Sequence, residues 1–442
     1  MSMKFLADIL KDSYYRIGSP KSVLLAYSAG ADSLAMLLGL RSVSDELPFK
    51  IVCAHVNHGL RAAAGGEERL ATQIAQYLGV SIIIKRVEVS RQGNLEAAAR
   101  EARYVALNQA MRECDAQVIA LAHHADDQAE TMMMNMVRGS GLDGLSGMRE
   151  FCPPYWRPLL NTPKEVLIDI LKDTGLQWAE DESNRDVTFF RNDLRLNVMP
   201  RFERRAPGAA MRMARTAKLL QDEQDMLQIE ATSWLYRHAK AEAPFFFLMS
   251  QPFKQLHLAM QRRVLRTLCL QAGILLDYEQ TNRVICFLSC TPGCFLTLPQ
   301  NAQVFLSSQR LHILPSDAKL KNVVWHQPQL ELHGDELGDG MHEQVVDANI
   351  IHGAIMRPVR IDDSIYPLGA SGKQTMRKYL SARKIDRPFR TYWPVYAVGS
   401  KVLWVPGCGV SQEAAINSDN QRKTKLVFTQ ALPHEILMDG EK

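Results

Sequence analysis

The chain has 442 residues, of which 46% are hydrophobic and 23% charged, so it is long enough for two to three domains with a sizeable core. Its eight cysteines are too few and too scattered for a disulfide framework, no apolar run is long enough to cross a bilayer, and no signal-peptide core stands at the amino terminus. We therefore expect a soluble, cytoplasmic protein.

The net charge is only +4, but the cationic residues are clustered. Nine Arg or Lys residues face three acids between Arg185 and Lys218, and nine again face three between Arg357 and Arg390. Two such patches in a nearly neutral chain indicate a polyanionic partner. Two solvated helix faces are the alternative, because a sequence does not show whether the charges share a face.

The first 150 residues alternate between strand-like and helical patterns. The apolar, strand-like runs are 23–26, 51–56, 81–89 and 117–122. The helical stretches that follow them are 33–43, 66–78, 94–114 and 126–137. Repeated β-α units predict a parallel sheet covered on both faces, with ligands gathered beyond the carboxyl ends of its strands.

The turn after the first strand is the strongest single signal. It consists of Ser28, Ala29, Gly30, Ala31, Asp32 and Ser33. A strand, a small-residue turn and a helix start direct backbone N–H groups and the positive end of a helix dipole at one point, which suits a pyrophosphate or triphosphate. Asp32 is then free to orient magnesium or a substrate ammonium group. An ordinary turn in which Asp32 and Ser33 cap the helix is the alternative.

Polar side chains also follow the second and fourth strands. His123 and Asp127 lie four residues apart across the turn after the fourth strand, so a ring nitrogen and a carboxylate could both face the nucleotide. Asp127 could form a carboxylate pair with Asp32 that suits magnesium or a cationic amine, although helix capping would also explain it. His55 and His58 offer only two zinc ligands, which favours a loop that closes over a nucleotide.

These motifs resemble those of a known family. The turn from Ser28 to Ser33 is similar to the Ser-Gly-Gly-x-Asp-Ser signature of the PP-loop ATP pyrophosphatases. The remaining motifs narrow the resemblance to the tRNA(Ile)-lysidine synthetases, and they occur at 55–61, 94–104, 123–131, 138–142, 157–160, 181–184 and 191–195. The resemblance is dense over residues 20–205 and thinner over 368–409.

The resemblance implies a reaction. In that family, the wobble cytidine of an isoleucine tRNA with a CAU anticodon is joined through carbon 2 to the ε-amine of free L-lysine, and ATP is converted to AMP and pyrophosphate. The pyrimidine oxygen is a poor leaving group, so it is first adenylylated, and lysine then displaces AMP. The product, lysidine, changes codon reading from AUG to AUA and amino-acid identity from Met to Ile.

The resemblance also implies roles for individual residues. ATP would contact the six residues of the turn, Ser28, Ala29, Gly30, Ala31, Asp32 and Ser33. Asp32 and Asp127 would serve Mg²⁺ and lysine, and His123 would contact phosphate. Arg103 would act on phosphate or the transition state, and Arg195, or else Arg191, would grip the cytidine or its phosphate. The residues expected to bind tRNA are Arg191, Arg195, Arg204, Arg205, Lys373, Arg377, Lys378, Arg387 and Arg390.

Ala29 departs from the family signature, because it occupies the position of the first glycine. If this position requires a positive φ, the methyl group costs about 1 to 2 kcal/mol. The displaced N–H would then weaken ATP binding.

The rest of the chain suits tRNA handling. We expect an α/β fold in which a Rossmann-like PP-loop domain (1–208) precedes a mainly helical middle domain (209–318), a linker (319–350) and a small α+β C-terminal tRNA-binding domain (351–442). Near its carboxyl end, cations are interleaved with Tyr379, Phe389, Tyr392 and Trp393, a combination that suits phosphate contacts and base stacking.

Two other functions stay open. One is a different PP-loop tRNA-modifying enzyme such as a thiolase, although the chain has no Cys-x-x-Cys pair. The other is a tRNA-binding protein with a decayed nucleotide loop. The spacing of Cys286, Cys290 and Cys294 does not match a usual zinc site. Both a homodimer and a monomer are compatible with the resemblance.

Overall fold

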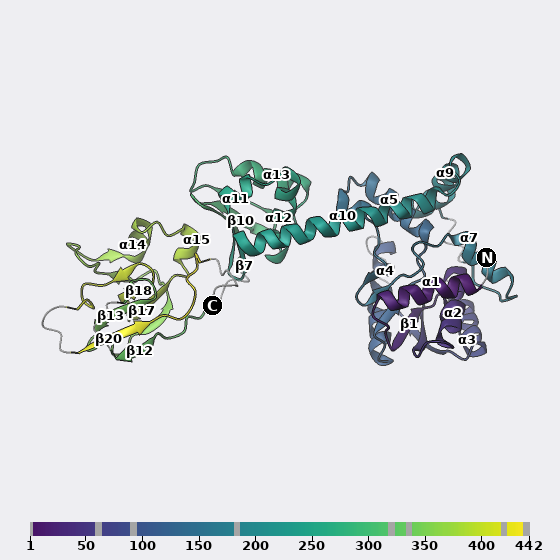
Figure 1. Ribbon diagram of the computed structural model, residues 1–442, viewed down its shortest axis with the longest axis horizontal. Helices are drawn as coiled ribbons and strands as arrows, with labels where there is room; N and C mark the ends of the chain where they lie inside the picture. Colours follow the sequence, from purple (N-terminus) through teal and green to yellow (C-terminus); the bar gives the residue numbers. More distant parts are fainter. Residues whose placement is uncertain are drawn as a thin grey trace. The chain divides into compact units, whose positions relative to one another are not determined.

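The computed structural model describes residues 3–57, 64–88, 95–180, 186–316, 323–332, 338–416 and 422–435. The chain divides into two compact units, Met1–Asp225 and Met226–Lys442, which are drawn in Figure 1. Among the helices of these ranges, none is long and apolar enough to cross a membrane.

The first unit is built on a six-stranded sheet with the strand order β3-β2-β1-β4-β6-β5. The strands are β1 (Ser22–Ala26), β2 (Lys50–Asn57), β3 (Ser81–Arg86), β4 (Val118–Ala120), β5 (Phe151–Cys152) and β6 (Tyr155–Trp156). β1 pairs in parallel with both β2 and β4, and the edge hairpin β5–β6 is antiparallel. The predicted parallel sheet is thus confirmed.

Helices cover both faces of this sheet. They are α1 (Met3–Arg16), α2 (Ala31–Ser44), α3 (Ala64–Tyr77), α4 (Leu95–Glu113), α5 (Ala125–Val137), α6 (Leu142–Leu145) and α7 (Lys164–Lys172). Successive strand residues point to opposite faces, so Leu25 and Cys53 pack in a core with α1, α2 and α7, while Leu24 and Val52 pack in a second core with α4. The continuous apolar runs of the sequence reflect this burial on both sides.

The central position of β1 determines where the functional loops lie. Because β1 and β4 are neighbours and parallel, the turn that begins α2 and the turn that begins α5 leave the same edge of the sheet. The four strands and four helices predicted in this region are all present. Their observed ends differ by a few residues from the predicted ones, as expected where helix ends are set by capping.

The first unit continues through a run of short helices. They are α8 (Phe190–Asp193), the π-helical turn η2 (Leu194–Val198) and α9 (Met199–Arg205), after which the 30-residue helix α10 (Ala209–His238) begins. The boundary between the two compact units falls within α10. Figure 1 shows α10 as the long teal helix.

The second unit first combines helices with a sheet. Its helices are α11 (Ser250–Lys254), α12 (Leu258–Gln271) and α13 (Tyr278–Phe287), as the predicted helical middle requires. Beside them lies a five-stranded antiparallel sheet that the sequence did not reveal, in the order β7-β8-β11-β10-β9. Its strands are β7 (Ala239–Glu242), β8 (Phe245–Met249), β9 (Phe295–Thr297), β10 (Gln303–Leu306) and β11 (Arg310–Leu314), with the short helix η3 (Pro299–Asn301) between β9 and β10.

The end of the second unit is a small α+β region, as predicted. Its three-stranded antiparallel sheet contains β12 (Gln329–Leu332), β20 (Lys423–Val427) and β13 (Glu343–Asp347). The second sheet contains β14 (Ile355–Pro358), β15 (Ser364–Ile365), β16 (Gln374–Thr375), β17 (Pro394–Val398), β18 (Lys401–Val405) and β19 (Gly409–Val410). Helices α14 (Met376–Ala382) and α15 (Arg387–Arg390) complete it.

Candidate active site

The turn after β1 is held together by hydrogen bonds of the Ser28 and Ser33 hydroxyls. The Ser33 hydroxyl accepts from the Ser28 backbone N–H at 3.2 Å and donates to the Gly30 carbonyl at 3.0 Å. Gly30 is the N-cap of α2, and no side chain caps this helix start, so the first N–H groups of α2 are left for another acceptor. This is the geometry that a phosphate group requires.

Ala29 adopts the conformation that its place in the turn suggested. Its φ is 63°, in the left-handed region, and the residue is completely buried. Its carbonyl accepts a hydrogen bond from the Ala179 N–H at 2.9 Å, which fixes the peptide. The methyl group therefore carries a strain of about 1 to 2 kcal/mol that a glycine would avoid.

The turn after β4 holds a second set of polar groups beside the first. His124 is the N-cap of α5, and its backbone N–H donates to Asp127 Oδ2 at 3.1 Å. This capping contact holds the Asp127 carboxylate at the helix start, where only 8% of the residue is exposed. Asp127 can therefore cap the helix and also take part in the site, because the capping contact is what positions its carboxylate.

His124 links three carboxylates. Its Nε2 lies 3.5 Å from Asp32 Oδ2 and 3.4 Å from Asp127 Oδ2, and its Nδ1 lies 3.4 Å from Asp126 Oδ2. Burial disfavours a charged ring, but the carboxylates outweigh it and raise the pKa of His124 to about 10. A buried imidazolium ion thus joins the two loops, and it brings Asp32 and Asp127 to one nitrogen, as the predicted carboxylate pair requires.

Asp32 has one oxygen without a partner. Its Oδ2 faces His124, and the Lys164 ammonium group at the start of α7 lies 3.9 Å from the same oxygen. Its Oδ1 is buried and accepts no hydrogen bond from the residues that the structure describes. A buried carboxylate oxygen normally has a donor or a cation beside it, so Asp32 Oδ1 marks a place for one.

Two arginines hold the other side of Asp127. Arg191 and Arg195 each donate to Asp127 Oδ1, at 3.0 and 3.2 Å, and both also bind Glu130. Burial disfavours the charged carboxylate, but His124 and the arginines hold the pKa of Asp127 below its usual range. Arg191 belongs to α8 and Arg195 to the π-helical turn, and such turns are frequent at functional sites.

Glu130 and Lys164 were not singled out from the sequence. Glu130 is 1% exposed and lies one helical turn after Asp127, so an acid on the buried face of α5 was the available signal. Lys164 follows a proline at a helix start, which gave no signal of its own. His124 was quoted only as part of a motif, because adjacent histidines cannot be told apart without knowing which way the turn rotates.

His123 and Arg103 lie near this cluster. Burial lowers the pKa of His123 to about 3, which Asp127 only partly offsets, so the ring is neutral and its Nδ1 has no described partner. The charge of Arg103, on α4, contributes to that lowering. Arg103 makes no ion pair with the described residues and is exposed. Both side chains are therefore available to a ligand.

The other predicted tRNA-binding residues are spread over the two units. Arg204 and Arg205 end α9 and are exposed. Exposed residues also include Lys373, Arg377 and Lys378, and Lys373 lies 3.7 Å from Glu413. Arg387 lies over the Phe295 ring at 5.1 Å, whereas Arg390 donates to the Ile385 carbonyl at 2.8 Å, which closes the turn before α15.

The expectation that aromatic residues near these cations stack on bases is wrong for three of them. Tyr379, Phe389 and Trp393 are at most 2% exposed and belong to the core of the C-terminal region. Their spacing reflects packing against the sheet, so none of them presents a ring to a partner in this arrangement.

Some sequence motifs lie elsewhere. His55 is buried and its Nδ1–H donates to the Tyr27 carbonyl at 3.0 Å, so this ring connects β2 to the start of the turn from Ser28 to Ser33. His58, Asn94 and the motif 181–184 lie outside the described residues. In the part of the chain that the structure describes, no group of three or more His, Cys, Asp or Glu residues is arranged to hold a metal ion.

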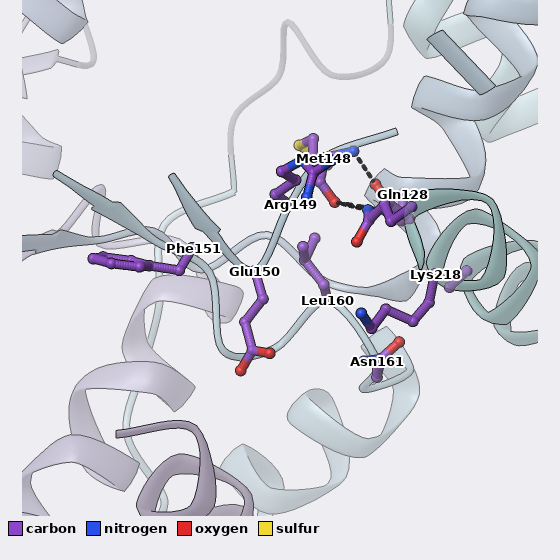
Figure 2. A pocket seen from close by; sticks show the side chains of 10 residues that line it. Gln128, Met148, Arg149, Glu150, Phe151, Leu160, Asn161 and Lys218 are labelled. Atoms are coloured by element: carbon purple, nitrogen blue, oxygen red, sulfur yellow. Dashed lines mark hydrogen bonds between the residues drawn. The ribbon is translucent and has the colours of Figure 1, made fainter. Parts of the chain in front are cut away.

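A hollow on the first unit lies beside α10, and its lining contains no residue of the Asp32–His124–Asp127 cluster (Figure 2). Gln128 donates to the Met148 carbonyl and accepts from its N–H, both at 2.8 Å, as Figure 2 shows. Gln221 donates to the same carbonyl, and Lys218 pairs with Asp222 at 2.6 Å. These polar groups already have partners within the protein, so the hollow offers fewer free groups to a ligand than the cluster around His124.

The arrangement as a whole combines an anion site with a cation site. The N-terminus of α2 and the serine hydroxyls suit phosphates, while the unpartnered oxygen of Asp32 suits a metal ion or an ammonium group. The arginines and Lys164 supply positive charge next to them. Such a site can neutralise a nucleotide and orient an amine in the same space.

Comparison with known proteins agrees with this site. The PP-loop domain family matches residues 4–202, and the TilS substrate C-terminal domain family matches residues 355–426. The tRNA(Ile)-lysidine synthase of Geobacter sulfurreducens is 32% identical over 436 residues, which cover 90% of this chain and 91% of that protein. The enzyme of the same name from Chromobacterium violaceum is 31% identical and covers 88% and 92%. Since the relatives match nearly from end to end and the PP-loop turn stands beside its partner carboxylates, the chain belongs to the tRNA(Ile)-lysidine synthase family.

Proposed function

We propose that the protein ligates free L-lysine to carbon 2 of the wobble cytidine of tRNA(Ile) with a CAU anticodon, through an adenylylated cytidine and with conversion of ATP to AMP and pyrophosphate. The observation that carries the proposal is the meeting of Asp32 and Asp127 at His124, directly beside the start of α2. One group of contacts thereby connects a phosphate site to a site for an amine.

ATP would lie with its phosphates at the turn from Ser28 to Ser33. The first backbone N–H groups of α2, which no side chain caps, would be donors to the phosphates. The hydroxyls of Ser28 and Ser33 would join them by turning from their contacts within the turn, where Ser33 donates to the Gly30 carbonyl and Ser28 accepts from the Gly30 N–H. The peptide between Ala29 and Gly30 is held by the contact with Ala179, so the N–H directions are set before the nucleotide arrives. Lys164 lies close enough to Asp32 to reach a phosphate at the same place.

Mg²⁺ fits the residues of this site. The unpartnered Oδ1 of Asp32 is a suitable ligand, and Mg²⁺ commonly takes one or two carboxylates together with phosphate oxygens and water. Asp127 is the second candidate, although its Oδ1 already accepts from Arg191 and Arg195. When bound, Mg²⁺ would supply charge neutralisation at the phosphates.

In the first chemical step, the cytidine oxygen on carbon 2 attacks the α-phosphorus and pyrophosphate leaves. In the second step, the lysine ε-nitrogen attacks carbon 2, the oxygen leaves with AMP, and the amine loses its proton. Asp32 and Asp127 would bind the α-ammonium end of lysine and fix its direction of attack. A lysine held in this way would direct its neutral ε-amine at carbon 2 of the cytidine.

Positive and neutral polar groups around the carboxylates would act on the phosphate and the base. Arg103 has no described ion-pair partner, so we assign it to the phosphate that departs or to the transition state. His123 is neutral and would donate a hydrogen bond to phosphate. Arg195, and next to it Arg191, would release part of their contact with Asp127 to grip the flipped cytidine.

The tRNA would extend over both units, because the anticodon and the acceptor stem lie far apart. We propose that it contacts cations of α9 and of the C-terminal region, namely Arg204, Arg205, Lys373, Arg377, Lys378, Arg387 and Arg390. We also propose a division into domains at 1–208, 209–318 and 351–442, with 319–350 as a linker. A homodimer is compatible with this function, and a cytoplasmic location brings the enzyme together with tRNA, ATP and lysine.

The test is incorporation of radiolabelled lysine into a tRNA(Ile) transcript with a CAU anticodon, in the presence of ATP and Mg²⁺. The wild type should label the tRNA and Asp127→Ala should not. Asp169→Ala is the matched control, because Asp169 is an exposed acid of α7 that pairs only with Lys172 among the described residues. It should label the tRNA as the wild type does.

The other outcomes distinguish the alternatives. Tight tRNA binding without any label would indicate a binding protein with a decayed nucleotide loop. Conversion of ATP to AMP that needs tRNA but not lysine would indicate a different PP-loop tRNA-modifying enzyme. In either case the proposed ligase reaction would be wrong.

A further inference from the structure

The loop between β14 and β15, residues 359–363, carries the most exposed large hydrophobic side chain among the described residues. Ile361 is 106% exposed, so its side chain touches essentially no other part of the protein. A single exposed hydrophobic residue is common and needs no explanation by itself. The surroundings of Ile361 make this one unusual.

The loop is held rigidly at its base. Arg357 and Asp363 form a bidentate ion pair with two contacts of 2.7 Å, and both residues are buried. Arg357 also donates to the Pro358 and Gly399 carbonyls, at 3.0 and 2.6 Å. Asp363 accepts from the Arg360 N–H at 2.7 Å as well, so the backbone on both sides of Ile361 is fixed. The exposure of Ile361 is therefore a property of an ordered loop.

The loop lies against the start of α14. The Met376 N–H donates to the Asp363 carbonyl at 3.2 Å, which places the first turn of α14 next to the loop. This turn contains Arg377 and Lys378, both exposed. Positive charge at a helix N-terminus opposes the helix dipole, so the two cations do not serve the stability of α14.

These cations have no counter-ions in the described parts of the chain. Arg360, Arg377 and Lys378 form no ion pair there. Of the three acids between Arg357 and Arg390, two are occupied inside the protein, because Asp363 binds Arg357 and Asp386 binds Arg310 and His312. Asp362 alone remains at the surface, and the cations outnumber it.

From this juxtaposition we propose that the 359–363 loop is an RNA contact, in which Arg360 and the first turn of α14 bind phosphates while Ile361 packs against an unpaired base or a ribose. Tyr379, Phe389 and Trp393 are buried, so Ile361 supplies an apolar contact that these three rings do not. The partner is an RNA for two reasons. Arg360, Arg377 and Lys378 favour a polyanion, and the ordered, apolar Ile361 beside them favours a polyanion that exposes the faces of its bases or sugars. The proposal rests on the proposed function in that the RNA would be the tRNA substrate.

The experiment measures the dissociation constant of the full chain for the CAU tRNA transcript, at several salt concentrations and without ATP or lysine. Ile361→Ser should weaken binding about tenfold, since a buried isoleucine side chain contributes on this scale, without changing the slope of log K against log salt. Arg360→Gln should lower the magnitude of that slope by about one. The control Leu275→Ser removes another aliphatic side chain, 75% exposed, and should leave both quantities as in the wild type.

Unchanged tRNA binding by Ile361→Ser would overturn the proposal, and a change in its sedimentation instead would show that the loop contacts protein. A similar loss in Leu275→Ser would also overturn it, because the effect would then not be specific to the loop. Since binding is measured without catalysis, the two proposals can fail separately. If the wild type forms no lysidine but Ile361→Ser still weakens tRNA binding, the reaction is wrong and the RNA contact stands.

Discussion

Arg195 donates to Glu130 twice, through Nε at 2.7 Å and through Nη2 at 2.9 Å, and so ties a π-helical turn to the buried face of α5. Arg191 binds the same carboxylate from the preceding helix at 2.8 Å. Glu130 therefore determines where both arginines stand relative to Asp127.

Replacing Glu130 with alanine should destabilise the first unit by about 3 to 5 kcal/mol, because it leaves two half-buried guanidinium groups without their main partner. Lysidine formation should fall more steeply than the folded fraction, since the arginines lose their position. Urea unfolding and lysine incorporation at a temperature where the variant is folded check the two effects. Glu165→Ala, at an exposed position of α7, is the control. Full activity of folded Glu130→Ala would contradict the positioning role.

Replacing His124 with asparagine should lower the free energy of unfolding by about 3 kcal/mol, because three carboxylates lose the cation between them. Added Mg²⁺ should restore more stability to this variant than to the wild type, since it supplies the missing charge. Thermal unfolding with and without MgCl₂ measures the difference. His326→Asn, at an exposed position, should show none. An equal response to Mg²⁺ in the wild type and His124→Asn would argue against the carboxylates as metal ligands.

Replacing Ala29 with glycine should relieve the strain of a left-handed residue, which is about 1 to 2 kcal/mol, while the more flexible unfolded chain takes back about 0.4 to 1 kcal/mol. We expect a net stabilisation of about 0.5 to 1 kcal/mol in urea unfolding and a KM for ATP that falls or stays equal. Ala31→Gly, at the first helical position of α2, should not stabilise the protein. A less stable Ala29→Gly would mean that the turn is not strained.

The second unit should lose stability as the pH falls below about 6.5, the usual pKa of histidine. Burial lowers the pKa of His312, and Arg310 adds to this, although Asp386 at 3.1 Å partly offsets it. As the pH falls, His312 is therefore protonated in the unfolded chain before it is protonated in the folded one. The free energy of unfolding is highest above pH 6.5 and declines as the pH falls toward the pKa of His312 in the folded protein. The pKa of Asp386 is also lowered, since His312 and Arg310 outweigh its burial, and this contribution is lost only at more acidic pH.

Thermal unfolding at pH 7.5 and pH 5.5 checks this dependence. In His312→Phe, which keeps a ring among Phe247, Phe305 and Phe389, the loss between the two values should shrink. The variant should also be less stable at pH 7.5, since the buried Asp386 carboxylate loses its contact with the His312 ring at 3.1 Å. An undiminished pH dependence in the variant would assign it to other groups.

The sequence predicted the first sheet well because its strands are continuous apolar runs between polar turns, as at 23–26 and 51–56. The edge hairpin β5–β6 and the five-stranded sheet of the second unit were not predicted. Most of these strands have two to five residues of mixed composition, which show neither a period nor a length that distinguishes them from loops. The exception is β8, whose five residues are all apolar, but a short apolar run alone does not distinguish a strand from a buried helical segment. The fold class was therefore easier to predict than the strand content of the middle region.

For the site, the sequence identified the loops better than the side chains within them. Asp32 and Asp127 could be paired because parallel strands carry their loops to one edge. The central place of His124 depends on the rotation of one turn, and the approach of Lys164 depends on a helix far along the chain, so neither follows from spacing. The aromatic residues of the C-terminal region were misjudged because burial, and not composition, decides whether a ring can stack.

The ionic groups around His124 also set the charge that a ligand must bring. Asp32, Asp126, Asp127 and Glu130 carry four negative charges, and His124, Lys164, Arg191 and Arg195 carry four positive ones. The charges of these eight side chains thus cancel, His123 adds none, and Arg103 beside them contributes one further positive charge. An ion that binds alone changes the net charge of this partly buried site. A nucleotide that binds together with cations changes the net charge less. We therefore expect the affinities of ATP, Mg²⁺ and lysine to depend on one another. Binding of a negatively charged ligand should strengthen the binding of a positively charged one, and the reverse.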